Sequence, residues 1–111
     1  KRVIAAMTYG KGITNPQITL PPTDYRFRQA WHQYVIRSPR RDELQRYLAE
    51  NGVETMIHYP VPPHLQPCYR GIFDGAYPVT ERLAGEVLSL PIANTGESEA
   101  SEIAEIINRF K

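Results

Sequence analysis

The sequence predicts an α/β fold class, namely an α+β two-layer sandwich in which helices cover one small sheet. β-rich and helical segments alternate in the order strand, helix, strand, loop, helix, strand, helix. Such alternation is typical of a sheet covered by helices. The β-rich segments are short, and a length of 111 residues suits one domain with one core.

The chain begins with what looks like the end of a helix. Val3, Ile4 and Met7 have helical spacing, but no capping residue precedes them. Gly10 suits the C-terminal stop of that helix. We interpret residues 1–24 as the tail of a truncated helix followed by a linker, and expect a preceding domain in a larger protein.

The expected linker, residues 10–23, contains three prolines and two glycines. Ile18 and Leu20 are its only alternating apolar pair, so it can supply at most one short edge strand. Regular structure is expected to resume in residues 25–111, which form the predicted domain proper.

A central strand is predicted over residues 30–38, where β-branched and aromatic side chains fall on both faces. His32 would share a face with Tyr34 and Ile36. Trp31, at the head of this strand, is expected in the core or as an interface anchor.

The next helix is predicted over residues 39–50. Ser38 can cap it, Pro39 suits its first position, and Asn51-Gly52 ends it. Its narrow apolar stripe consists of Leu44, Tyr47 and Leu48.

Five more elements are predicted in the second half of the chain. A strand over residues 53–58 leads into a loop, and a short helical turn is expected over residues 64–69. Another helix opens at Tyr77-Pro78 and ends at Leu90-Pro91, with residues 88–92 as a short last strand. The apolar side of that helix would be Val79, Leu83, Val87 and Leu88. The terminal amphipathic helix is indicated by Ile103, Ile106, Ile107 and Phe110.

The loop after residue 58 has the composition of a binding loop. Proline fixes φ and removes an amide donor, so a proline-rich segment stays extended and stiff. Its prolines are Pro60, Pro62, Pro63 and Pro67. This stiff segment also carries His58, Tyr59 and His64, which suits a position facing a ligand.

A transition-metal site is one alternative for these side chains. His58, His64 and Cys68 could form a zinc-binding module, although ligand pairs in structural zinc sites are usually closer in sequence and a fourth ligand is needed. His58 could also be a strand-end histidine bonded to backbone. For Cys68 a nucleophilic role lacks a fixed base, and we expect a small buried hydrophobe.

The arginines near Ser38 allow two interpretations. Arg37, Arg40 and Arg41 could grip phosphate at a helix N-terminus. Because arginine there opposes the helix dipole, we expect solvated charges instead.

Composition excludes several classes of partner. Thirteen basic and twelve acidic residues produce no field that would attract nucleic acid or an anionic membrane. No apolar run is long enough to span a bilayer, and residues 1–10 do not resemble a signal peptide. A single cysteine makes no internal disulfide, which fits a reducing, cytoplasmic location.

Several short motifs then occur in a recognisable order and spacing. They are Trp31-His32-Gln33-Tyr34-Val35-Ile36-Arg37, Arg41-Asp42-Glu43-Leu44, Asn51-Gly52-Val53-Glu54-Thr55, Ile57-His58-Tyr59-Pro60, Pro63-His64-Leu65-Gln66-Pro67, Tyr77-Pro78-Val79 and Leu88-Ser89-Leu90-Pro91. Together they resemble the C-terminal region of the DegT/DnrJ/StrS sugar aminotransferases, over about residues 30–111.

The resemblance implies the small domain of a fold-type I, aspartate-aminotransferase-like enzyme that uses pyridoxal phosphate (PLP). Such enzymes transfer an amino group from glutamate to a keto group on a nucleotide-linked sugar, and the resemblance implies a homodimer. It also implies that His58, Tyr59, Pro60 and His64 line the cleft where the sugar nucleotide meets the cofactor. His32 is a further candidate, equally explained as packing beneath the cleft.

The cofactor groups themselves are not expected in this sequence. PLP chemistry needs a Schiff-base lysine, an acid on the pyridinium nitrogen and a phosphate cradle. The lysines here are only Lys1, Lys11 and Lys111, and in the family those groups belong to a large N-terminal domain. We expect a fragment that is inert alone. The alternative is a free-standing α/β ligand-binding or regulatory module.

Overall fold

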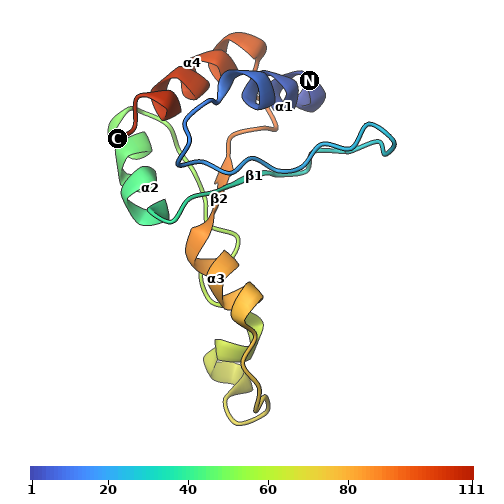
Figure 1. Ribbon diagram of the computed structural model, residues 1–111, viewed down its shortest axis with the longest axis vertical. Coiled ribbons are helices and arrows are strands. Elements are labelled where there is room, and N and C mark those ends of the chain that lie inside the picture. The colour runs from blue at the N-terminus through green and yellow to red at the C-terminus, as the bar shows by residue number, and fades with distance from the viewer.

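A computed structural model describes all residues, 1–111, as helices arranged around a two-stranded sheet (Figure 1). The elements are α1 (Arg2–Gly12), β1 (Tyr34–Arg37), α2 (Arg41–Glu50), the 3-10 turns η1 (Pro63–Leu65) and η2 (Pro67–Tyr69), α3 (Pro78–Glu86), β2 (Val87–Leu90) and α4 (Glu97–Asn108). The expected class, a small sheet accompanied by helices, is confirmed, as are the helical turns after residue 62 and the terminal helix.

The sheet is antiparallel and is extended by one bridge on each side. Tyr34 of β1 lies opposite Leu90 of β2. Thr19 bridges to Arg37, and Met56 bridges to Ser89. The order across the sheet is therefore Thr19, β1, β2, Met56, and the short edge strand expected near Ile18 is present as a single bridge.

The strand predicted over residues 53–58 is wrong in extent, because only Met56 pairs with the sheet. Alternate residues of a strand direct their N–H and C=O groups to the same edge. β2 has four residues, so its outer edge offers very few pairing groups, and Ser89 supplies the pair that is used.

β1 is also shorter than predicted, since it begins at Tyr34 rather than near residue 30. Trp31 has φ 51°, a left-handed conformation that is uncommon for a bulky residue and incompatible with a strand. Its ring instead packs against the ring of Tyr34, with centroids 5.3 Å apart.

Three helix boundaries differ from expectation. α1 continues to Gly12 rather than ending at Gly10. α2 begins at Arg41, and Ser38 Oγ accepts a hydrogen bond from the Arg40 amide at 3.1 Å, just ahead of the helix. α3 ends at Glu86 and continues directly into β2. Val87 and Leu88, predicted on the apolar side of the helix, therefore belong to the strand.

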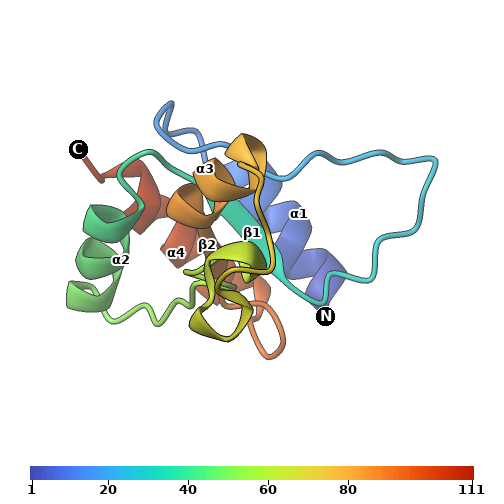
Figure 2. The same ribbon diagram turned by 90° about the horizontal axis from the view of Figure 1, so that it is seen from below.

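Helices α1 and α4 lie side by side along one side of the sheet, whereas α2 lies near its end (Figures 1 and 2). The buried face of α1 carries Ala5, Ala6 and Tyr9. A Cβ on Gly12 would lie 3.0 Å from that of Ala104, so a small residue is needed where the helices approach. Tyr9 also donates a hydrogen bond to the carbonyl of Pro91 at 2.7 Å.

Asn15 and Asn108 connect the ends of the same two helices. Asn15 is buried, and its side-chain amide donates to the carbonyls of Ile107 and Phe110 at 2.8 and 2.9 Å. The segment after α1 is therefore fixed to the body and is not a free linker.

The core comprises 18 buried apolar residues. They are Ala5, Ala6, Tyr9, Ile13, Ile18, Tyr34, Ile36, Leu44, Leu48, Val53, Leu88, Leu90, Ile92, Ala100, Ile103, Ala104, Ile107 and Phe110. None lies between Ile18 and Tyr34, or between Val53 and Leu88.

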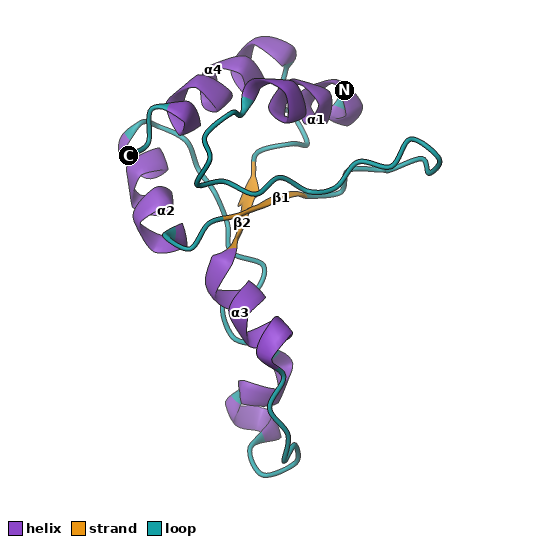
Figure 3. Ribbon diagram, viewed as in Figure 1, coloured by secondary structure: helices purple, strands orange, loops and turns teal.

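These two gaps in the core correspond to two projections. We call residues 21–30 the first arm and residues 58–86 the second arm; the second contains η1, η2 and α3 and extends away from α1 and α4 (Figure 1). Much of each projection is loop rather than helix or strand (Figure 3). α3 has no buried residue, so the second arm has no core of its own.

Candidate functional site

His58 lies where the second arm leaves the sheet, two residues after the Met56 bridge. Its Nδ1 is 2.8 Å from Ser89 Oγ, and its ring is half-buried. Tyr59 stands edge-on to it, with ring centroids 5.5 Å apart, across a cis peptide bond. His58 is thus bonded to a side chain of β2, and its Nε2 makes no hydrogen bond within the chain.

His58 and His32 line one pocket of about 410 Å³ beside β2. His32 is exposed, so it does not pack beneath the surface. The remaining lining residues are Gln33, Glu54, Thr55, Met56, Ser89, Leu90, Pro91, Ile92 and Ala93. We call this the histidine pocket. It contains donors, acceptors and apolar surface, and it has no lysine or arginine in its lining.

Tyr59 and Pro60 lie farther along the arm. Tyr59 is 71% exposed, and both residues line a shallow hollow shared with Val61, Gln66, Pro67 and Cys68. The exposed phenol ring offers an apolar face with a polar tip, which suits contact with a planar or sugar ring.

His64 is held within the second arm. Its Nε2 lies 2.9 Å from Glu81 Oε1, and its ring packs edge-on against Tyr77 with centroids 4.7 Å apart. The side chain is 8% exposed. His64 therefore joins the proline loop to α3, and it does not line the histidine pocket.

The zinc alternative is not supported by these positions. His58 faces Ser89, His64 faces Glu81, and no group of three or more His, Cys, Asp or Glu side chains is placed to hold a metal ion. Cys68 is exposed, so its expected burial is wrong. Residues 67–80 are all exposed, because the tip of the second arm lies away from the core.

The expectation of solvated arginines is wrong for Arg41. It is 7% exposed, and its Nη1 donates to the carbonyls of Ala84 and Val87 at 2.9 and 3.0 Å. Its Nε also contacts Asp42 at 2.6 Å. Arg41 thereby satisfies one carbonyl in the last turn of α3, where carbonyls lack helical partners, and one at the start of β2, and it fixes the base of the second arm to α2.

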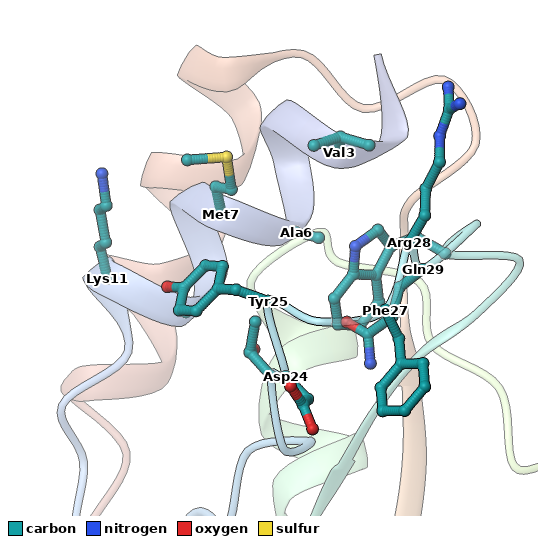
Figure 4. A pocket seen from close by; sticks show the side chains of 12 residues that line it. Val3, Ala6, Met7, Lys11, Asp24, Tyr25, Phe27, Arg28 and Gln29 are labelled. Carbon is teal, nitrogen blue, oxygen red and sulfur yellow. The ribbon is translucent and has the colours of Figure 1, made fainter.

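A second pocket lies between α1 and the first arm (Figure 4), and we call it the apolar pocket after the hydrophobic side chains in its lining. Its volume is about 550 Å³, and Val3, Met7, Tyr25, Phe27 and Trp31 are among its lining residues. Sequence reasoning missed this pocket. Its only signal was the helical spacing of Val3 and Met7, which lie on the exposed side of α1.

None of the helices is long and apolar enough to cross a membrane.

Comparison with known proteins identifies the family of this chain. The model of the DegT/DnrJ/EryC1/StrS aminotransferase family matches residues 1–110. The chain belongs to this family.

Individual aminotransferase-family proteins agree with that assignment. EryC1 of Saccharopolyspora erythraea, named an erythromycin biosynthesis sensory transduction protein, is 52% identical over 89 residues, which cover 78% of this chain and 24% of EryC1. The dTDP-3-amino-3,6-dideoxy-α-D-galactopyranose transaminase of Aneurinibacillus thermoaerophilus is 39% identical over 111 residues, covering 99% of this chain and 30% of that enzyme.

A solved structure of the family has the same fold. The crystal structure of S. venezuelae DesV in complex with a ketimine intermediate superposes with a TM-score of 0.90 at 37% identity. The match covers 96% of this chain and 30% of DesV. This family chain therefore spans less than a third of the length of these relatives.

The family works with pyridoxal phosphate, but the residues of this chain do not form a site for it. Lys11 lines the apolar pocket together with Asp24. Asp24 is paired with Arg26 at 2.7 Å, and this hydrogen bond lowers the pKa of the Asp24 carboxyl. Lys1 and Lys111 are exposed at the two chain ends. No lysine, acid and phosphate cradle come together.

The residue most clearly missed by sequence reasoning is Ser89. It belongs to the Leu-Ser-Leu-Pro motif, and nothing local in the sequence connects it with His58, 31 residues away. A polar residue within an otherwise apolar four-residue strand was the one available signal.

Proposed function

We propose that this chain is the C-terminal small domain of a PLP-dependent aminotransferase that acts on a nucleotide-linked keto sugar, with glutamate as amino donor. Residues 25–111 would form the small domain, and residues 1–24 the helix and connection leading into it. In this proposal the enzyme is a cytoplasmic homodimer. The observation that carries the proposal is the family match over residues 1–110.

Exposed apolar side chains support a neighbouring domain or subunit. They lie on α1 and along the second arm, and comprise Val3, Ile4, Met7, Tyr59, Val61, Leu65, Tyr69, Ile72, Phe73, Tyr77 and Val79. Extended apolar surface of this kind marks an interaction site. The large N-terminal domain and the second subunit are the proposed occupants.

The proposed substrate contacts divide between direct and indirect roles. His58 and His32 would bind the substrate in the histidine pocket, and Tyr59 would cover one face of it. Pro60 would restrict the backbone that carries Tyr59. His64 would act through Glu81 and Tyr77, because these contacts hold the proline loop against α3.

When bound, PLP supplies the electron sink for amino transfer, and the groups that hold it would come from outside this chain. The residues described here bind and orient the sugar nucleotide and exclude water from one side of the site. Such positioning contributes to rate by fixing reacting groups in a productive geometry.

His58→Ala in the full-length enzyme tests the role of the site. We expect a lower kcat or a higher substrate KM in an enzyme that stays folded, because His58 lies outside the core. Asn94→Ala, at an exposed position, is the control. Normal kinetics for a correctly folded His58→Ala enzyme would remove His58 from the proposed site.

The existence of a large domain has a separate test. Mass spectrometry of the native gene product should detect a polypeptide much heavier than the 12.7 kDa of this chain. A native product of that lower mass would favour a free-standing α/β ligand-binding module instead.

A further inference from the structure

Ser89 fixes the base of the second arm through its backbone. It lies in β2 and is 7% exposed. Its amide donates to the carbonyl of Met56 at 2.8 Å, and its carbonyl accepts from the Met56 amide at 3.2 Å. The same residue therefore holds the segment that ends at His58.

The Ser89 side chain fixes the imidazole as well. Its Oγ lies 2.8 Å from His58 Nδ1 and has no other hydrogen-bond partner. A buried hydroxyl requires an acceptor for its proton, and Nδ1 is the only acceptor in reach. With Ser89 as the donor, the proton of the neutral ring resides on Nε2, which then acts as a donor itself.

The lining of the histidine pocket restricts what this donor can bind. It contains the carboxylate of Glu54 and no lysine or arginine. A diphosphate would require cationic or multiple charge-assisted partners and would be repelled by Glu54. A neutral oxygen, such as a sugar hydroxyl or carbonyl, matches a single N–H donor beside a carboxylate acceptor.

We propose that Ser89 is a positioning residue that holds His58 in the Nε2–H tautomer, and that this N–H donates to a neutral oxygen of the sugar. The proposal rests on the proposed function, because it assumes a nucleotide-sugar substrate. It assigns His58 to the sugar portion of that substrate rather than to its diphosphate.

The tautomer can be measured without any substitution. Long-range ¹H–¹⁵N correlation spectra of full-length protein containing ¹⁵N-labelled histidine, recorded at about pH 8 where histidine is ordinarily neutral, should assign the His58 proton to Nε2. A proton on Nδ1 would overturn the proposal. Ser89→Ala should produce a mixture of tautomers, and Ser89→Thr, which keeps the hydroxyl, should restore the Nε2–H form.

Ligand binding provides the second measurement. We expect Ser89→Ala to raise the substrate KM about 3- to 10-fold, as for loss of one hydrogen bond, with Ser89→Thr restoring it. The affinity for thymidine diphosphate or uridine diphosphate alone should not change. An equal loss of nucleoside diphosphate affinity would show that His58 contacts phosphate and would overturn the assignment to the sugar.

A matched control separates positioning from stability. Ser38 is also buried and accepts a hydrogen bond from the Arg40 amide. Ser38→Ala should therefore destabilise the fold but leave both the His58 tautomer and the substrate KM unchanged. If His58→Ala weakens substrate binding but Ser89→Ala does not, this inference fails and the proposed function stands. If His58→Ala changes neither ligand's binding, the proposed site itself fails.

Discussion

The main-chain amide of Asn15 donates a hydrogen bond to Asn108 Oδ1, 93 positions away in the sequence. Asn108 Oδ1 accepts from the Asn15 amide at 3.1 Å and from the Thr14 amide at 2.8 Å. Asn108 Nδ2 donates to the carbonyl of Gly12 at 2.8 Å, while Asn15 donates to carbonyls at the end of α4. Each asparagine thus satisfies backbone groups of the other helix, where both helices end.

Removing the Asn15 side chain should destabilise the chain. Asn15→Ala leaves the carbonyls of Ile107 and Phe110 without these donors, and we expect the free energy of unfolding to fall by about 1–3 kcal/mol. Urea unfolding followed by Trp31 fluorescence measures the change. Asn94→Ala, which removes no hydrogen bond, is the control, and an equally small effect for both variants would contradict a role for the Asn15 contacts.

Core truncation should cost more. Leu48 and Ile107 are fully buried, so Leu48→Ala and Ile107→Ala should each lower the free energy of unfolding by about 2–5 kcal/mol. Leu65→Ala is the matched control in the chain alone, because Leu65 is 56% exposed. A cost near zero at either buried position would show that the helix does not pack with that face inward.

Arg41 should hold the second arm to the body. Arg41→Ala removes the donors to the carbonyls of Ala84 and Val87, and we expect a loss of about 1–3 kcal/mol together with faster amide hydrogen exchange in α3. Arg46→Ala is the control, since Arg46 is exposed on the same helix. Unchanged exchange in α3 after Arg41→Ala would mean that the arm is held by other contacts.

Alkaline pH should destabilise the fold partly through Tyr34. Burial raises the pKa of Tyr34 from 10.0 to about 12, because the buried phenolate is poorly solvated. Because the pKa of Tyr34 is higher in the folded than in the unfolded state, its contribution to the free energy of unfolding is fully present below pH 10. That contribution is lost as pH rises towards 12.

Urea unfolding at several values of pH across that interval tests the effect. Tyr34→Phe has no phenol to ionise at this position, so its stability should decrease less steeply with pH than that of the parent chain. Parallel stability curves for the two proteins would indicate that Tyr34 is not responsible for the alkaline loss.

The elements that the sequence predicted well are those specified by local patterns. Ile103 and Ile107 repeat with the helical period and are buried in α4, and Asn51-Gly52 follows α2, where Gly52 has φ 80°. Periodicity and turn chemistry are properties of neighbouring residues, so they are readable without a structure.

The errors occurred where distant residues decide the outcome. Residues 53–58 are β-rich, but a strand also needs a partner edge, and the short β2 provides little of one. Arg41 is charged and begins a helix, yet it is buried, because it donates hydrogen bonds to the carbonyls of Ala84 and Val87, 43 and 46 positions away. Trp31 has a left-handed backbone that keeps it out of β1, and no local pattern predicted this conformation.

The candidate site was predictable only in part. The prolines and histidines identified the loop from composition, whereas the hydrogen bond between Ser89 and His58 depends on β2 lying beside residue 56. The division of the histidines, with His32 and His58 in one pocket and His64 on α3, likewise depends on the path of the second arm.

The separation of the second arm from the core has a consequence for redesign. No core residue lies between Val53 and Leu88, so the tip of the arm, residues 66–76, can be exchanged for that of a relative while Tyr77, which packs against the buried ring of His64, is kept. A graft of this kind would transplant the arm's surface onto an unchanged scaffold, provided that Arg41 and the Ser89 anchorage are retained.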